Sequence, residues 1–507
     1  MAIRLAGLNS GMDTDAMVSD LVKAYKTKGD KIKKEQTKLE WKTDKWKDLN
    51  KKIKSFYSKY TANMQYSSYY NKKTTTVSDS TKATVVTADN AVNGTQSLEV
   101  TALAKAGYLT GAKLDSGTTS ATTLGDLGFS GSATITINQG AQEKDAAGNG
   151  TGVYNKEPVT FDVTADTKIS DVVDYFKSAG YNASFDEANG RMFISSKQSG
   201  EDNNFDLSSN TGNAASALTA LGLMGTGSVK IDGSNAKITL NNAEFESNSN
   251  TFSVNGLTIT AKELTSGPIS IATDTDYEGI YDSIKSFIKD YGELISEMDK
   301  LYNADRAKGY EPLTDEEKEA LSDAEVEKWE TKIKDSLLRG DGTLSTVSNI
   351  LKNSMLQTYE VDGKTLSLSN FGIHTLGYFD SEENEKGVFH IDGDPDDEKT
   401  SGNTDLLKAA IASDPEAVSG FFQKLTQNMY NQLSKLSAST TNRSYGNFYD
   451  DKKMDADYKD YTTKISDWED YVKSVEDRYY DQFTKMEKAM ANLNSQQSYI
   501  SSLFGLG

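Results

Sequence analysis

Apolar side chains recur every seven residues near both ends of this 507-residue chain, separated by charged and polar residues. The N-terminal series is Val18, Tyr25, Ile32, Leu39, Trp46, Ile53 and Tyr60, and the C-terminal series is Ile465, Val472, Tyr479, Met486 and Leu493. A seven-residue apolar repeat predicts long helices that pair as a coiled coil. The pairing could close one chain on itself or join two subunits.

The second position of each repeat differs between the two ends. Tyr461, Trp468 and Val475 keep it apolar in the C-terminal series, whereas Lys28, Glu35 and Lys42 interrupt it in the N-terminal series. We therefore expect the apolar seam between the two helices to be weak. Such a seam fits terminal helices that are partly disordered before assembly and become ordered on assembly.

The first helix is expected to begin near residue 10, within GLNSGMDTDAMVSDLV at positions 7–22. Ser10 and Asp13 have the spacing of a capping box, and acidic residues suit the first turn of a helix. The same glycines do not make a phosphate-binding loop, because no Lys follows them as that chemistry requires.

The central part of the chain has a different pattern. Residues 74–272 are rich in Thr, Ser, Gly, Asn and Asp, and short runs alternate between apolar and polar positions, as in 133–138 and 257–261. This period of two predicts strands joined by turns, interrupted by a helix at 168–178. Helical spacing returns near 277–295, a capping box at Thr314 opens another helix, and 340–395 reads as short strands and turns.

Charge separates the two ends. Residues 23–59 contain fourteen Lys against five acidic residues, a net charge of +9, and residues 450–488 contain twelve acidic against eight basic residues, a net charge of −4. Opposite charges favour pairing of the two segments, although a lysine-rich run is equally explained as a solvated helix face. The whole chain carries −20, which argues against nucleic acid as a partner. No run of 18 apolar residues predicts membrane insertion.

Motifs for catalysis or cofactor binding are lacking in the sequence, so we predict no enzyme, no cofactor and no metal site. There is no Cys, and the two histidines, His374 and His390, lie outside any ligand spacing. The acidic run from Asp392 resembles a calcium loop but has Asp397 and Asn403 where that loop needs Gly and Glu. Gly363-Lys364-Thr365 ends like a phosphate-binding loop, yet Asp362-Gly363 between two strand-like runs predicts a hairpin turn.

Several blocks of sequence resemble the bacterial flagellar filament cap family, FliD or hook-associated protein 2. The resemblance is carried by the segments 7–22, 39–50, 267–276, 311–339 and 483–496. The stretch 123–200 also looks like a β-rich insert shared by caps and flagellins. Flagellin itself is similar in architecture but lacks the 39–50 and 267–276 blocks, so the cap family is the better match.

This resemblance implies a homo-oligomeric ring of four to six subunits at the filament tip, where exported flagellin folds and inserts. It implies extracellular placement by the flagellar type III route without a cleaved signal peptide, and the N-terminus indeed lacks a secretory signal pattern. It further implies contacts with the hook–filament junction protein and with an export chaperone at the C-terminal helix. Some caps bind mucin, so the alternative function is an adhesin that binds mucin or glycan through its β domains.

Together these observations predict an elongated multidomain α+β protein, with coiled-coil segments from both chain ends and two central β-rich domains. The expected division is 1–50 with 455–507 as terminal helical segments and 51–73 with 273–454 as a helical stalk with a small strand-containing part. Residues 74–110 with 226–272 are expected to form one β-rich domain, into which 111–225 is inserted as a second β-rich domain with one helix. We predict that the assembly seam consists of Ile32, Leu39, Trp46, Ile53, Trp468, Val472, Val475 and Tyr479.

Overall fold

The computed structural model describes residues 11–377 and 379–503. Its internal contacts divide the chain into two compact units, residues 71–276 and the remainder from both ends. The terminal unit contains α1 (Thr14–Phe56), α4 (Tyr277–Asn303), α5 (Asp315–Glu319), α6 (Asp323–Ser336), α7 (Gly342–Leu356), β16 (Tyr359–Val361), β17 (Lys364–Leu366), β18 (Ile373–Thr375), β19 (Phe389–Ile391), α8 (Leu406–Ser413), α9 (Pro415–Leu436) and α10 (Asp451–Leu503).

The core of the terminal unit is formed by helices that are far apart in the sequence. The C-terminal third of α1 packs against α4, and side chains of α7 and α9 complete the same buried cluster, which is rich in aromatic rings. Phe287 of α4 contacts both Phe56 and Phe422 through its ring, with centroid distances of 5.7 and 6.3 Å. Buried side chains on α4 recur at three- and four-residue spacing, so one face of that helix is fully covered.

Local signals in the sequence correctly predicted several elements of this unit. Thr314 caps α5, its hydroxyl accepting from the backbone N–H of Glu317 while the Glu317 carboxylate accepts from that of Thr314. Asp362 and Gly363 both have positive φ values, 50° and 76°, between the paired strands β16 and β17. That is the backbone of a type I′ hairpin, which Asp-Gly favours.

The start of α1 differs from the prediction. Its N-cap is Asp13, whose carboxylate accepts from the backbone N–H of Ala16 at 3.0 Å. Ser10, the expected cap, lies outside the described residues. Asp13 satisfies a free N–H of the first turn and places its charge where the helix dipole favours it, so one residue does what the pair was expected to do.

The central unit is built from antiparallel strands and two helices, one helix more than the sequence predicted. Its elements are β1 (Lys73–Val77), β2 (Ala83–Thr87), β3 (Gly94–Ala102), β4 (Tyr108–Thr110), β5 (Ser132–Lys144), β6 (Gly150–Thr164), α2 (Ile169–Ser178), β7 (Tyr181–Asp186), β8 (Arg191–Ser196), β9 (Phe205–Asp206), α3 (Gly212–Ala220), β10 (Val229–Ile231), β11 (Ala236–Leu240), β12 (Ala243–Ser247), β13 (Thr251–Val254), β14 (Leu257–Ala261) and β15 (Ile269–Thr275).

Two separate buried clusters organise these strands. The sheets β1-β15-β3-β11-β12 and β13-β14-β2 enclose one cluster, which includes Leu98, Ile238 and Ile259. The sheets β10-β4-β8-β7 and β6-β5-β9, with α2 and α3, enclose the other, which includes Ile194 and Phe176. Alternate residues of β11 and β14 are buried, as expected for strands with one covered face.

The α+β class predicted from the sequence is confirmed, with helices from both chain ends and strands in the middle. The four-part division of the chain stays a prediction, since the contacts define two units. Within the part of the chain that the structure describes, we find no helix both long and apolar enough to cross a bilayer.

Candidate assembly site on the terminal helices

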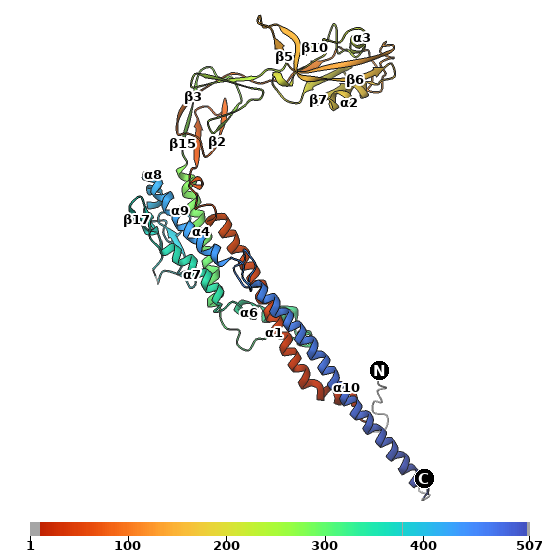
Figure 1. Ribbon diagram of the computed structural model, residues 1–507, viewed down its shortest axis with the longest axis vertical. Coiled ribbons are helices and arrows are strands. Elements are labelled where there is room, and N and C mark those ends of the chain that lie inside the picture. The colour runs from red at the N-terminus through yellow and green to blue at the C-terminus, as the bar shows by residue number, and fades with distance from the viewer. Residues whose placement is uncertain (1–10, 378, 504–507) are drawn as a thin grey trace. The chain divides into compact units, whose positions relative to one another are not determined.

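The helices α1 and α10 run side by side in opposite directions (Figure 1), because the loop between α9 and α10 turns the chain back onto α1. Asn50 of α1 holds this loop: its side-chain oxygen accepts from the backbone N–H of Phe448 at 2.9 Å, and its amide donates to Asn447 at 3.1 Å. Trp46 stacks on Tyr449, with ring centroids 5.5 Å apart and planes 6° from parallel. The start of α10 is therefore fixed against the buried end of α1.

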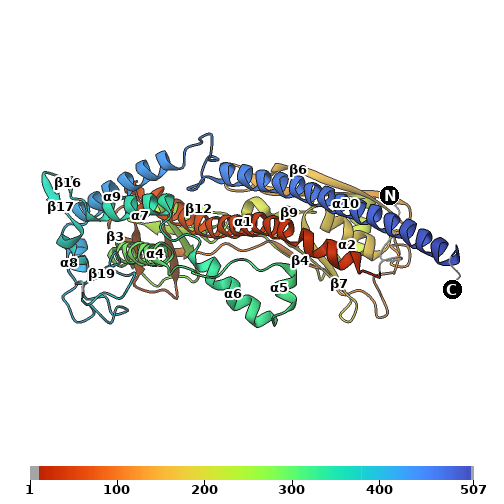
Figure 2. The ribbon, with the colours of Figure 1, turned by 90° about the horizontal axis from the view of Figure 1, so that it is seen from below.

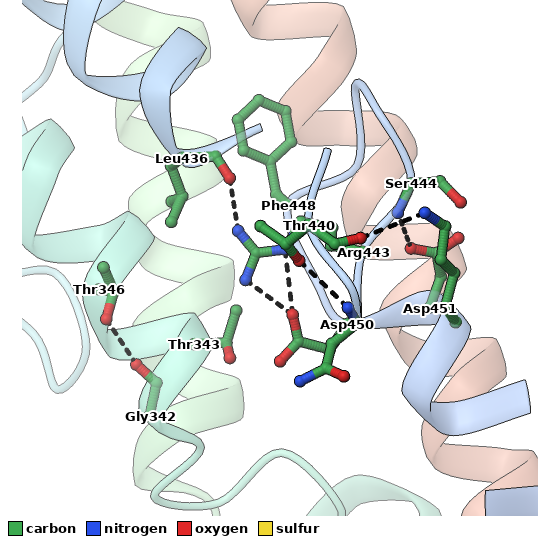
Figure 3. A network of polar contacts seen from close by, with 12 residues as sticks. Gly342, Thr343, Thr346, Leu436, Thr440, Arg443, Ser444, Phe448, Asp450 and Asp451 are labelled. Atoms are coloured by element: carbon green, nitrogen blue, oxygen red, sulfur yellow. Dashed lines mark hydrogen bonds and ion pairs between the residues drawn. The ribbon is translucent and has the colours of Figure 1, made fainter. Parts of the chain in front are cut away.

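An arginine at the centre of the same loop ties its two ends together (Figure 3). The Arg443 guanidinium donates to the carboxylate of Asp450 at 3.1 and 2.9 Å and to the backbone carbonyl of Leu436 at the end of α9. The backbone N–H of Ser444 donates to Asp451 at 2.7 Å, a bond that helps hold the Asp451 pKa below its ordinary value despite burial. The loop is thus a rigid connection.

The middle of the helix pair is polar. Gln36 donates to the hydroxyl of Thr462 at 2.8 Å, and Thr43 contacts the sulfur of Met454 at 3.6 Å. Ile32 and Leu39 are only half-buried. Hydrogen bonds between half-exposed groups add little net stability, so this stretch holds the helices weakly.

A second apolar patch closes the far part of the pair. Val18 and Val22 of α1 pack with Val472 and Val475 of α10, and Trp468 and Tyr479 cover them. Gly29 makes room for Trp468, since a Cβ at Gly29 would lie 3.0 Å from the indole Cδ1. The indole N–H donates to the backbone carbonyl of Tyr25 at 2.9 Å. We call the four valines, Trp468, Tyr479 and Gly29 the distal patch.

The eight predicted seam residues therefore fall into three groups. Trp46 and Ile53 are 1% and 0% exposed in the core of the terminal unit, whereas Trp468, Val472, Val475 and Tyr479 lie in the distal patch. Ile32 and Leu39 lie in the polar stretch between them. The structure does not bring the eight together as one seam, and their contact with a second subunit stays a prediction.

Two residues of this site were missed by the sequence reasoning. A glycine inside a helix costs about 1 kcal/mol relative to alanine, so Gly29 in an otherwise unbroken helical pattern was a readable signal of close packing. Asn50 carried no such signal, because an exposed and a buried asparagine look alike in a sequence.

Several large apolar side chains at the far end of the helix pair remain exposed. On α1, Met17 and Leu21 are 41% and 43% exposed. The helix α10 continues past the start of α1 (Figures 1 and 2), and this extension carries Leu493, Tyr499, Ile500 and Leu503, which are 53% to 67% exposed. Exposed apolar side chains in such a series are typical of a surface that a partner covers.

A mostly exposed segment, residues 304–341, lies beside α1 (Figure 2) and forms ion pairs with its lysines. Lys34 pairs with Glu317 at 2.8 Å, Lys42 with Asp341 at 2.8 Å and Lys45 with Asp335 at 3.3 Å. The Lys34 ammonium holds the pKa of Glu317 below its ordinary value. Between 304 and 332 the structure buries only Pro312 and Glu330, so the Lys34–Glu317 ion pair rather than an apolar core holds this part against α1.

We expect Lys34→Gln with Lys42→Gln to loosen this segment. Half-exposed ion pairs contribute about 0.5 kcal/mol each, so amide exchange in α5 should rise about five-fold. Hydrogen-exchange mass spectrometry measures it. The control, Lys47→Gln with Lys51→Gln, removes two ion pairs internal to α1 and should leave α5 unchanged. Equal exchange in both variants would contradict electrostatic attachment.

The two histidines and the acidic run serve a structural purpose. His374 and His390 face each other across β18 and β19, and their ring nitrogens lie 3.0 and 2.6 Å from the carboxylates of Asp392 and Asp397. Lys285 of α4 contacts Asp394 and Asp396 of the same loop. Across residues 11–377 and 379–503, no cluster of three or more His, Asp or Glu side chains is arranged to hold a metal ion.

Family models match both ends of the chain, including the helices just described. The model described as "Flagellar hook-associated protein 2 N-terminus" matches residues 10–107, and that described as "Flagellar hook-associated protein 2 C-terminus" matches residues 233–495. The chain belongs to the FliD family.

Curated FliD proteins resemble this chain over nearly their whole length. Flagellar hook-associated protein 2 of Halalkalibacterium halodurans is 22% identical over 551 residues, covering 99% of this chain and 100% of the relative. The protein of the same name from Escherichia coli K12 is 25% identical over 527 residues, covering 99% and 98%. A crystal structure of the flagellar cap protein FliD D1-D2-D3 domains from Escherichia coli has the same fold, with a TM-score of 0.50, 22% identity and coverage of 78% and 97%.

Proposed function

We propose that this FliD chain caps the flagellar filament as a homo-oligomer at its tip, where it promotes the folding and insertion of exported flagellin and prevents its loss. Membership of the FliD family supports the capping role. The observation that carries the rest of the proposal is the exposed apolar series at the far end of α1 and α10. In a cap these side chains would be covered by filament subunits or neighbouring copies.

The weak middle of the helix pair supports the same proposal. A cap must let each new flagellin pass and must therefore release and remake its contacts. A helix pair with a polar middle and only a small distal patch can open at its far end while its base stays anchored by Trp46 and Asn50. The extension of α10 is also the surface on which we place an export chaperone, since an apolar helix face needs cover before assembly.

The deciding experiment uses a strain that lacks this gene. Filament length by electron microscopy and flagellin in the medium are measured after complementation with the full chain, with a chain ending at residue 489, and with Ser474→Asp as a control at an exposed position of α10. We expect the full chain and the control to restore long filaments. The shortened chain should leave short filaments and monomeric flagellin in the medium. Normal filaments in the uncomplemented strain would refute the cap assignment.

A further inference from the structure

The central unit contains two buried clusters, and the chain crosses between them twice, after β3 and after β10. We call the strands around each cluster a module: the first module contains β3 and β11, the second β4, β8 and β10. Two crossings alone would allow the modules to rock against each other. We propose that these crossings and the loop after β8 form a rigid joint that holds the two modules in one orientation.

The backbone of the two crossings is paired. Lys105 and Ser234 exchange both N–H to carbonyl bonds, at 2.9 and 3.0 Å, as an isolated antiparallel bridge. The Lys105 carbonyl also accepts from the N–H of Gly200, in the loop after β8, at 3.1 Å. Three separate segments are therefore joined by one small network of hydrogen bonds. This network restricts the rotation that two unpaired linkers would allow.

Glycine allows these segments to come together. A Cβ at Gly233 would lie 2.7 Å from the Lys105 carbonyl oxygen, 2.8 Å from the Gly107 nitrogen and 3.0 Å from the Gly200 carbonyl oxygen. All three are backbone atoms, so none can swing aside as a side chain could. The φ of Gly233 is not in the left-handed region, and close approach is the reason that glycine is needed here.

Asparagine side chains extend the joint on both sides. Asn235, beside β11, accepts from the backbone N–H of Glu201 at 2.8 Å. Asn248, in the turn after β12, donates to the Asp202 carboxylate at 2.6 Å and accepts from the Asp202 N–H at 3.3 Å. Asn155 of the second module donates to the same carboxylate at 2.7 Å. Asp202 is thereby held from both modules.

The side chain of Asn204 also belongs to the joint, because it pairs with the backbone of Gly233. Its side-chain oxygen accepts from the N–H of Gly233 at 2.6 Å, and its amide donates to the Gly233 carbonyl at 3.2 Å. An amide that pairs with both backbone groups of one residue fixes that residue as a neighbouring strand would. Because these hydrogen bonds hold the joint rigid, the two modules should rotate together and not independently.

The test measures the orientation directly in the full chain, which has no native Cys. Lys177→Cys in α2 and Glu244→Cys in β12 place spin labels on exposed positions of the two modules. We expect one narrow distance distribution by double electron–electron resonance. Adding Asn235→Ala and Asn248→Ala should abolish the single narrow distance. The matched control, Asn182→Ala, removes an exposed asparagine that bonds to Ser195 within the second module and should keep it.

A second variant covers the case in which the alanine pair disturbs folding. Asn248→Asp keeps the shape of the side chain but sets a carboxylate against Asp202, so it should broaden the distribution while circular dichroism stays unchanged. A broad distribution in the parent, or a narrow one in every folded asparagine variant, would overturn the proposed joint. Neither outcome bears on the capping role, which is tested by filament growth.

Discussion

Replacing Trp46 with alanine is expected to lower the free energy of unfolding of the terminal unit by about 3–5 kcal/mol, the usual loss when a large buried aromatic is truncated. Trp46 is 1% exposed and stacks on Tyr449, so its removal leaves a cavity and also frees the loop that positions α10. Chemical denaturation followed by far-UV circular dichroism measures the change, with two-state behaviour of the terminal unit checked by a second probe.

Trp41→Ala is the matched control for Trp46→Ala. Trp41 lies on the same helix but is half-buried, and Lys334 rests on its ring with the ammonium 4.5 Å from the centroid. A half-exposed cation–π contact contributes about 1 kcal/mol, so the loss should be several-fold smaller than at Trp46. Similar losses at both positions would mean that Trp46 is not a core residue. If Trp46→Ala lowered the free energy of unfolding only slightly but prevented assembly, Trp46 would belong to the subunit seam predicted from the sequence.

Val475→Asp is expected to open the far part of the helix pair without unfolding the core. Val475 is 1% exposed in the distal patch, and burying an unpaired carboxylate there costs at least about 3 kcal/mol. The rate of amide exchange in residues 14–32 and 465–483 should rise more than about a hundredfold. Exchange in α4 and α9 should stay unchanged, because the polar stretch separates the distal patch from the core.

Ser474→Asp adds the same charge one residue away, at an exposed position. It should leave the exchange of the distal segments within about two-fold of the parent, as is usual for surface substitutions. If both aspartate variants exchange alike, the two helix ends are already apart in solution. That result would mean that the contacts of the distal patch form only on assembly.

The pairing of the chain ends illustrates how far a sequence pattern reaches. A seven-residue apolar repeat indicates that one side of a helix is covered, and Val18 of α1 is covered by valines of the expected partner, α10. The same repeat continues through Trp46 and Ile53, yet these side chains belong to the core that α1 shares with α4, α7 and α9, and Trp46 stacks on Tyr449 of the loop before α10. The spacing is identical in both cases, because burial by any apolar neighbour selects the same spacing.

The sequence by itself determined the α+β class, the long terminal helices, the strand-rich centre and the turn at Asp362-Gly363. Each of these depends on interactions between residues near in sequence, such as caps, turn residues and periodic apolar positions. Only the tertiary structure decided that the seam splits into a core and a distal patch and that Asn50 anchors α10. It alone also placed Asn235, Asn248 and Gly233 at one joint. These depend on which distant segments meet, and a pattern that reports burial does not say which segment covers a residue.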